Sequence, residues 1–375
     1  MIYIVFFIVA TMLSFCSEFA RNRGNKYFYG LLVILLIVTV SILNGTRDFT
    51  IGTDIRVYGN KYFELALFSY RFVDYLDLTR SFYNLDVEYG YQALNYLVSR
   101  FTNNIHIFYF ILGILTNGLF YLGITRFRQW VSIPLSFLTY LFLFYGNTLN
   151  IMRQSVAMAF VFLGISLFIT SKKRLGIAML FCSLLFHNSA IVGFAILLLY
   201  IILEKSKNTL KLHLTILLSA LTVSVSAVTI LGMLTKTGLI GNKFEQYIGT
   251  NQSESDVSLS TIGMRLPMVV WWIRSYKSLV KKNLFFSFMF LITMMDLIFI
   301  SLRMIDITVS RVILYLAVFK IISYPLIIKY SIKDKNLRFL CYLLFIGYLI
   351  LVWYLQVVVG GNGEIYPFTS EILGI

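Results

Sequence analysis

Two apolar runs separated by a basic turn, within residues 147–190, constrain the fold of this chain more than any other feature. The first run is Ile151–Thr170, the second is Leu175–Phe186, and Lys172–Arg174 lies between them. At about 1.5 Å per residue, a helix over the first run would cross the roughly 30 Å core of a bilayer. We therefore expect a membrane hairpin whose basic turn lies in the cytoplasm, by the positive-inside rule.

Both open ends of this hairpin carry unusual polar residues. Arg153 and Gln154 stand near the start of the first run, and His187 follows the second. Because the two runs are antiparallel, these ends should lie together on the face opposite the basic turn. The hairpin thus predicts a permanent cation beside a titratable ring at the outer ends of adjacent helices.

The composition places the whole chain in the membrane. Of its 375 residues, 59% are hydrophobic and only 13% are charged, as in polytopic membrane proteins. The net charge of +15 does not indicate nucleic-acid binding, because no basic cluster lies on a soluble domain. Cys16, Cys182 and Cys341 fall in apolar runs without metal-ligand spacing. The first apolar run lacks a cleavage site, which predicts a retained anchor.

Apolar segments alternate with basic turns along the entire sequence, which predicts an all-α, polytopic integral membrane protein with about 12 transmembrane helices. The short inner turns hold more lysine and arginine than the longer outer segments, and both termini are expected outside. The expected crossings are Ile2–Phe15, Tyr27–Leu43, Ile105–Thr125, Ile133–Tyr145, Ile151–Thr170, Leu175–Phe186, Ala190–Leu203, Leu212–Leu234, Gly263–Tyr276, Leu284–Leu302, Thr308–Ile328 and Phe339–Val359.

We expect residues 1–375 to form a single transmembrane domain. A long outer loop, residues 44–104, is too charged to span and carries amphipathic stretches such as Glu88–Phe101. A second outer loop covers about residues 235–262. Two crossings, Leu175–Phe186 and Ile133–Tyr145, are short, so they are expected to be tilted, extended by polar neighbours, or re-entrant.

In this topology, polar residues that are rare in membranes gather on the outer side. Ionisable groups at membrane depth are costly, so they usually face a cavity or one another. Guanidinium groups bind phosphate bidentately and keep their charge, so several of them would stabilise a pyrophosphate leaving group without a metal. The residues are Arg47, Asp48, Asp54, Arg56, Tyr58, Glu88, Tyr91, Arg153, Gln154, His187, Arg265, Arg303 and Arg311.

Structural roles remain open for several of these residues. In the structural interpretation, Arg153 extends to lipid headgroups and His187 forms a hydrogen bond with a carbonyl group. Arg47, Asp48 and Asp54 would form a loop network, and Arg303 and Arg311 would be end charges. Asp296 and Asp306 would neutralise nearby arginines. The pair Asp86 and Glu88 matches the metal-binding acids of some glycosyltransferases, but such spacing is common by chance. No hydrolase, zinc-protease or nucleotide-binding motif stands in a matching context.

Taken in order, the polar motifs resemble the EpsG family of bacterial polysaccharide polymerases, which are similar in role to Wzy O-antigen polymerases. The resemblance covers nearly the whole chain and implies an enzyme of the bacterial inner membrane. Such an enzyme joins oligosaccharide repeats linked to undecaprenyl pyrophosphate at the periplasmic face. The motifs are Arg47, Gly52–Asp54, Tyr58, Glu88 with Gly90–Tyr91, Arg153–Gln154, Phe186–His187 with Ser189, Ser310–Arg311 and Tyr366–Phe368.

The resemblance implies roles for these residues, with no metal and no cofactor. Arg47, Arg153 and Arg311 would hold the pyrophosphate, assisted by Arg265 or Arg303, with Gln154 and Tyr58 lining the site. The general base would be Asp54, Glu88 or His187, and it would contribute roughly 10²–10⁴-fold to the rate. Asp54 is favoured, because a carboxylate near arginines stays ionised, although such a carboxylate is also a weaker base.

Two other functions use the same lipid. A flippase for lipid-linked glycans should carry its charges at mid-membrane, whereas here they collect at one face. An O-antigen ligase shares the donor but is expected to have one much larger outer loop. For the polymerase, the expected partners are lipid-linked glycans, membrane lipid and a chain-length regulator, with no nucleic acid. The sequence does not specify the sugar or the linkage.

Overall fold

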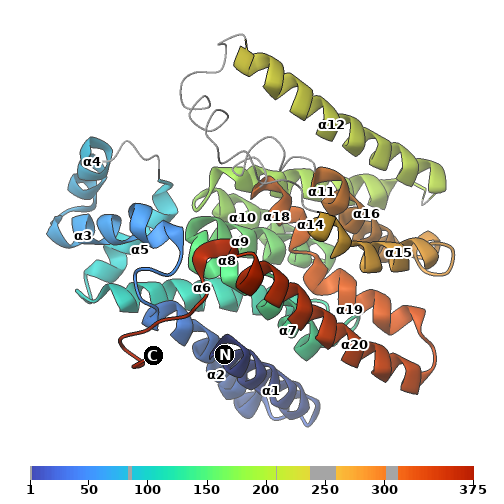
Figure 1. Cartoon of the computed structure of the whole chain (residues 1–375), viewed down its shortest axis with the longest axis horizontal. Coiled ribbons are helices and arrows are strands. Elements are labelled where there is room, and N and C mark those ends of the chain that lie inside the picture. The colour runs from blue at the N-terminus through green and yellow to red at the C-terminus, as the bar shows by residue number, and fades with distance from the viewer. Residues whose placement is uncertain (1, 83–86, 208, 237–258, 301–310) are drawn as a thin grey trace. The chain divides into compact units, whose positions relative to one another are not determined.

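The structure, a computed structural model, describes residues 2–82, 87–207, 209–236, 259–300 and 311–375 (Figure 1). Throughout these ranges the chain is helical and forms no strand. The residues fall into two compact units, unit 1 (Met1–Ile191 and Tyr342–Ile375) and unit 2 (Val192–Cys341). The single transmembrane domain stays a prediction. Most of the second predicted loop, residues 235–262, lies outside the described residues.

Within the described residues, seven helices are long and apolar enough to cross a membrane, which indicates a multi-pass membrane protein. The all-α fold class is therefore confirmed, while the count of twelve crossings stays a prediction. The seven are Ile2–Asn22, Lys26–Thr46, Ile105–Thr125, Met152–Ile169, Asn188–Lys205, Arg311–Ser331 and Lys335–Val359. Shorter apolar helices are Ile133–Leu143, Leu210–Ser226 and Leu284–Ile298.

Unit 1 contains the hairpin and the segment that follows the second helix. Its elements are α1 (Ile2–Asn22), α2 (Lys26–Thr46), the π-helix η1 (Ile55–Gly59), α3 (Asn60–Phe68), α4 (Phe72–Phe82), α5 (Tyr89–Ser99), α6 (Ile105–Thr125), α7 (Ile133–Leu143), α8 (Tyr145–Asn150), α9 (Met152–Ile169), α10 (Lys173–Leu184) and η2 (Asn188–Ile191). Most of α20 (Lys335–Trp353), with η7 (Tyr354–Val359) and η8 (Asn362–Glu364), completes it.

Unit 2 carries the remaining apolar helices. They are α11 (Val192–Lys205), α12 (Leu210–Lys236), α14 (Leu259–Gly263), α15 (Leu266–Arg274), η4 (Val280–Lys282), α16 (Leu284–Ile298), η6 (Arg311–Ile313), α18 (Leu314–Ala317) and α19 (Lys320–Ser331). The start of α20 also belongs to this unit.

The expected hairpin is present as α9 and α10, which pack against each other closely. The contact is made through two glycines: a Cβ atom on Gly176 would lie 2.6 Å from the carbonyl oxygen of Gly164. Small residues of this kind let two helices approach closely in a membrane. Helix α10 has only 12 residues and is about 18 Å long, so the shortness expected of the second arm is confirmed.

Replacing Gly176 by alanine should lower the stability of the hairpin. The added methyl group has no space against Gly164 and Phe168, and overpacking of this kind costs about 1–3 kcal/mol. Gly30 in α2 is the matched control, because nothing lies within 4 Å of a Cβ atom there. Thermal unfolding in detergent should show a lower Tm for G176A than for G30A. Equal Tm values for the two variants would contradict the close packing.

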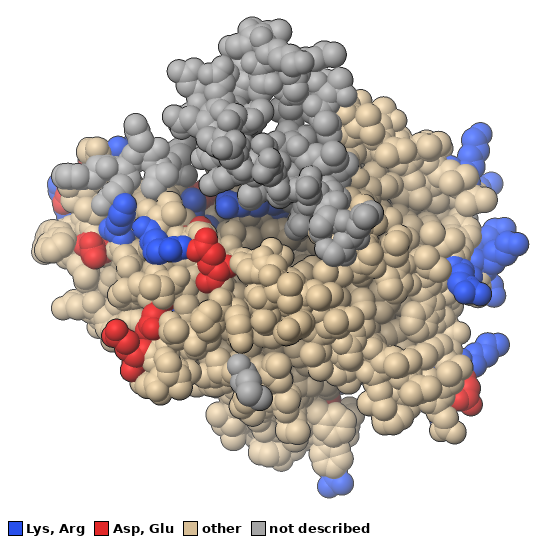
Figure 2. Space-filling model, viewed as in Figure 1, with Lys and Arg blue, Asp and Glu red and all other residues tan. Residues whose placement is uncertain are grey.

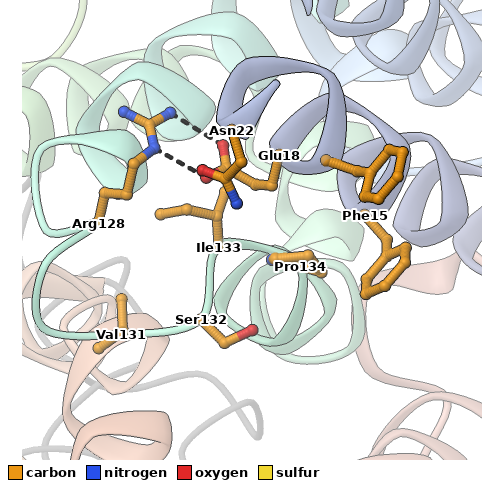
Figure 3. Close-up of a pocket in the computed structure, with 9 residues that line it drawn as sticks. Phe15, Glu18, Asn22, Arg128, Val131, Ser132, Ile133 and Pro134 are labelled. Atoms are coloured by element: carbon orange, nitrogen blue, oxygen red, sulfur yellow. Dashed lines mark hydrogen bonds and ion pairs between the residues drawn. The ribbon is translucent and has the colours of Figure 1, made fainter. Parts of the chain in front are cut away.

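The basic turns of unit 1 lie at one end of its helices. After α6, Arg128 pairs with Glu18 of α1 at 2.8 Å, on the wall of a cavity of about 250 Å³ (Figure 3). Arg126 donates from Nε to Oγ1 of Thr170 at 3.1 Å, next to the turn of the hairpin. The end of α2, the start of α6 and the start of α9 therefore share the opposite end.

The exposed surface of unit 1 is divided between apolar helices and a charged region. Large apolar side chains of α1 and α2 are exposed, among them Met12, Phe15 and Ile34. Such a broad apolar surface is typical of contact with lipid. Charged side chains gather instead over α3 to α5, on the left of Figure 2. The segment between α2 and α6 is therefore the polar part of this unit.

Candidate active site

Six of the residues singled out in the sequence meet at the end of unit 1 opposite its basic turns. We call them the polar cluster: Arg47, Asp54, Tyr58, Glu88, Arg153 and His187. They come from the segment after α2, from the start of α5, from the start of α9 and from the segment after α10. Hydrogen bonds, an ion pair and a cation–π contact link them, in part through neighbouring residues.

Gly52 lets the segment after α2 pack closely against the joint between α8 and α9, where one helix ends and the next begins. Its φ angle is +82°, and a Cβ atom would lie 2.2 Å from the carbonyl oxygen of Leu149. Only glycine fits such a conformation and approach. Next to it, Thr53 donates from its backbone nitrogen and its hydroxyl to Oδ1 of Asn150, at 2.9 and 2.6 Å. The Gly-Thr-Asp sequence is therefore a docking turn that fixes Asp54.

Asp54 lies at the beginning of α9. Its Oδ2 atom accepts the backbone N–H of Met152, the first residue of that helix, at 2.8 Å. Free N–H groups and the helix dipole both favour a carboxylate at this position. The hydroxyl of Tyr58 donates to the same oxygen. Asp54 is thus held by two donors from different segments, in a half-buried place.

Tyr58 connects Asp54 with Arg153. Its side chain is buried, and the guanidinium of Arg153 lies 4.4 Å from the centre of its ring, a cation–π contact. Burial raises the pKa of the Tyr58 phenol well above its ordinary value, and the neighbouring Asp54 carboxylate raises it further. The phenol therefore keeps its proton at neutral pH and acts as a hydrogen-bond donor.

Arg153 forms an ion pair with Glu88 at 2.5 Å. The second oxygen of Glu88 accepts the backbone N–H of Asn188 at 3.0 Å, which ties α5, α9 and the segment after α10 together. Gly90 allows this approach, because a Cβ atom there would lie 2.5 Å from the carbonyl oxygen of Leu185. Arg153 therefore has a protein carboxylate as partner, which the sequence analysis did not assign.

The ring of His187 has a fixed orientation. Ser189 donates its backbone N–H to Nδ1 at 3.2 Å, and its hydroxyl lies 2.6 Å from the same atom. Because a backbone N–H can only donate, Nδ1 is the acceptor and the neutral ring carries its proton on Nε2. The interpretation of His187 as bonded to a carbonyl group does not hold at Nδ1, whose partner is Ser189.

Arg47 is the buried member of the polar cluster. Only 1% of its surface is exposed, Nη1 donates to the carbonyl oxygen of Leu149, and Nη2 lies 3.0 Å from Sδ of Met152. Burial lowers the pKa of this guanidinium, yet arginine keeps its charge at neutral pH. Its contacts stabilise the joint between α8 and α9, where Asp54 is bound. Gln154, in the first turn of α9, is also buried.

Three further arginines were predicted for the pyrophosphate site. Arg265 and Arg311 belong to unit 2, and Arg303 lies outside the described residues, as do Asp86, Asp306 and Ser310. Arg265 donates from Nε to Asp296 at 2.9 Å, so the alternative that Asp296 neutralises an arginine is confirmed.

Sequence reasoning missed Lys320, whose Nζ lies 2.6 Å from the same Asp296 carboxylate. A single lysine inside the long apolar run Leu314–Ile328 is the signal that would have found it, because charge at membrane depth is costly. The buried group of Arg265, Asp296 and Lys320 is therefore the charged centre of unit 2.

Glu364 is a second residue that the sequence did not reveal. Its carboxylate pairs with the guanidinium of Arg56, 308 residues earlier in the chain. Both side chains are about half exposed, at 52% for Arg56 and 53% for Glu364. No spacing rule connects such distant residues.

Comparison with curated proteins and with solved structures finds no match. The sequence model of the EpsG family, in contrast, matches residues 30–370, from α2 to beyond η8. The matched range includes the whole polar cluster, all of unit 2 and most of unit 1, and it confirms the resemblance seen in the sequence. The chain belongs to the EpsG family, a family of Wzy-like polymerases and glycosyltransferase-related membrane proteins.

Proposed function

We propose that this protein joins oligosaccharide repeat units carried on undecaprenyl pyrophosphate, at the periplasmic face of the bacterial inner membrane. Membership of the EpsG family supports a polysaccharide polymerase in general. The observation that carries the proposal is the polar cluster, in which a carboxylate and a guanidinium share one tyrosine, Tyr58. Such paired charges suit the attack of a hydroxyl on a carbon that carries a pyrophosphate leaving group.

The distribution of charge in unit 1 supports the proposed membrane face. Arg126, Arg128 and the Lys172–Arg174 turn lie at one end of its helices, and the polar cluster lies at the other. By the positive-inside rule the basic end faces the cytoplasm. The cluster then opens toward the periplasm, where lipid-linked repeat units would be polymerised.

In the proposed reaction, a hydroxyl of the acceptor repeat attacks the anomeric carbon of the donor glycan. The bond between that carbon and the pyrophosphate oxygen breaks, and undecaprenyl pyrophosphate leaves with the bonding electrons. The proton of the attacking hydroxyl passes to the general base. Arginine side chains offset the negative charge that develops on the leaving group, a role for which fixed guanidinium groups are suited.

Among the candidate bases, the contacts favour Asp54. Both oxygens of Glu88 are engaged, by Arg153 and by the N–H of Asn188, and its side chain is only 9% exposed. His187 uses Nδ1 to accept from Ser189, so its neutral ring presents a donor at Nε2. Asp54 is half-buried, accepts hydrogen bonds from Met152 and Tyr58, and through the Tyr58 ring lies beside Arg153, the residue proposed for the leaving group. We therefore assign the base to Asp54 and a positioning role to Glu88.

For the leaving group, Arg153 is the proposed binding residue of unit 1, with Tyr58 and Gln154 as its neighbours. Arg47 is buried and acts through the α8–α9 joint, so we propose a positioning role for it. We also propose that the pyrophosphate is bound by Arg265, Arg303 and Arg311. The guanidinium groups would do this without a metal.

Deleting the gene should leave cells with a single repeat unit attached to its final acceptor, because polymerisation fails while export continues. Plasmid-borne wild-type protein should restore the ladder of longer products on a gel. In vitro, purified protein and a synthetic lipid-linked repeat should give longer glycans and free undecaprenyl pyrophosphate, unaffected by a chelator. Deletion cells without any exported repeat would indicate a flippase. Polymer that stays on the carrier lipid would indicate a ligase.

A further inference from the structure

The segment of residues 360–375 packs along the segment that carries Asp54. Four hydrogen bonds join them: Gly52 N–H to the Glu364 carbonyl at 3.0 Å, Asp48 N–H to the Thr369 carbonyl at 3.1 Å, Glu371 N–H to Oδ1 of Asp48 at 2.9 Å, and the Ser370 hydroxyl to the Thr46 carbonyl at 2.5 Å. Tyr3 of α1 adds a hydrogen bond to the Ile365 carbonyl at 2.7 Å. Residues 360–375 therefore form part of the rim of the polar cluster.

Glu364 occupies an unusual backbone conformation in this rim. Its φ angle is +51°, in the left-handed region that favours glycine, and Gly361 and Gly363 beside it are also left-handed. A glutamate keeps such a conformation only where surrounding contacts hold it, and such places often coincide with functional sites. Among the contacts that hold it are the Gly52 N–H on its carbonyl group and the Arg56 guanidinium on its carboxylate.

The Arg56–Glu364 pair differs from the other ion pairs that join separate elements of unit 1 in the described residues. Arg153 and Glu88 are only 18% and 9% exposed, and Arg128 and Glu18 are 25% and 16% exposed. The Arg56 and Glu364 side chains are about half exposed. Exposed ion pairs are weak and exchange readily, whereas covered ones do not.

A guanidinium that binds a carboxylate also fits the oxygens of a phosphate. Glu364, the partner of Arg56, accepts the N–H of Gly52 in the same turn that carries Asp54, so a phosphate that replaces Glu364 on Arg56 would bind at the rim of the cluster. Displacing Glu364 from Arg56 requires no change in the covered part of the cluster, because this pair is at the rim.

We propose that Arg56 is a binding residue for the pyrophosphate of the lipid-linked substrate, and that Glu364 occupies it until the substrate arrives. This inference rests on the proposed function and adds a competing carboxylate to it. Glu364 competes with the substrate for Arg56 and so weakens binding of the pyrophosphate. It leaves Arg56 when the pyrophosphate takes its place. The two partners of one ion pair must therefore affect substrate binding in opposite directions.

Binding of undecaprenyl pyrophosphate to the full-length protein in nanodiscs tests this, with undecaprenol as the uncharged lipid. Glu364→Gln should tighten binding of the pyrophosphate lipid roughly 2- to 5-fold, the gain expected when a weak exposed competitor is removed. Arg56→Gln should weaken binding by about 10-fold, as for the loss of one charged contact. The double variant should match Arg56→Gln. Undecaprenol binding should not change in any of them.

Arg71 and Asp74 are the matched control, since they form an exposed ion pair in the same unit, at the start of α4. Arg71→Gln and Asp74→Asn should leave binding unchanged. Inorganic pyrophosphate, added as a competitor, separates recognition of the anion from recognition of the lipid chain. Thermal unfolding of each variant identifies any that fails to fold.

A purely structural ion pair would give the same direction of change in Arg56→Gln and Glu364→Gln, or no change in either. If the wild-type protein binds the lipid and polymerises, that result for the two variants would overturn the inference and leave the proposed function intact. Wild-type protein that neither binds undecaprenyl pyrophosphate nor extends a lipid-linked repeat would overturn the proposed function as well.

Discussion

Replacing Arg153 by alanine should abolish polymer formation. The change leaves Glu88 as a covered carboxylate without its cation and removes the contact with the Tyr58 ring. Breaking a buried ion pair in this way costs about 3–5 kcal/mol, which corresponds to a loss of roughly 10²–10⁴-fold in any equilibrium that depends on it. Arg153→Lys should also fail, because an ammonium group neither stacks on tyrosine nor binds bidentately. Gel analysis of glycan ladders measures the effect.

A double variant separates the structural part of this loss from the catalytic part. Changing Arg153 to methionine and Glu88 to glutamine removes both charges, so most of the stability should return. Polymer should still be absent if the guanidinium binds the substrate. Lys173→Ala, at the basic turn of the same hairpin, should behave like wild-type protein. Normal ladders from Arg153→Ala would exclude the proposed role of this residue.

Replacing Asp54 by asparagine should slow polymerisation by about 10²–10⁴-fold, the usual contribution of a positioned general base. The amide oxygen still accepts the N–H of Met152 and the hydroxyl of Tyr58, so the fold should change little. Asp54→Ala also removes the acceptor at the start of α9, so it should lose about 1 kcal/mol of stability in addition. The turnover of a synthetic lipid-linked repeat, together with Tm, gives both quantities.

Asp48 provides the control for this experiment, because it lies in the same segment and accepts the Glu371 N–H instead. Asp48→Asn keeps that bond and should retain most of the activity. Full activity in Asp54→Asn would show that the proton goes elsewhere. The same measurement on Glu88→Gln and His187→Gln would then identify the base.

The hairpin was predictable from the sequence because the relevant pattern is local. Apolar runs of helical length on either side of three consecutive basic residues leave few alternatives to two antiparallel helices. Antiparallel packing then brings the region of His187 to the start of α9, and the structure shows this: Glu88 bonds both Arg153 and the N–H of Asn188.

The partners of these residues could not be predicted, since they depend on how separate segments meet. Nothing in the sequence pairs Glu88 with Arg153, or Arg56 with Glu364, because each pair joins different elements. The burial of Arg47 could not be predicted either, because its partner, the carbonyl group of Leu149, lies at the joint between α8 and α9 and not in a sequence motif.

The roles assigned to the site residues remain predictions, as does the number of crossings. Helix lengths explain why the number of membrane crossings is hard to predict from the sequence. The apolar run Ile133–Tyr145 contains α7, which ends at Leu143, and a separate short helix, α8, begins at Tyr145; neither helix spans a bilayer alone. An apolar run marks where a helix forms but not where the helix is interrupted.

Unit 1 is discontinuous, because its last part, Tyr342–Ile375, follows the whole of unit 2 in the chain. Insertion into the membrane proceeds from the N-terminus during synthesis. A nascent chain released before α20 therefore holds Asp54 and Arg153 but lacks Glu364 and the hydrogen bonds to Gly52 and Asp48. The rim around Asp54 can therefore form only after the whole of unit 2 has been synthesised.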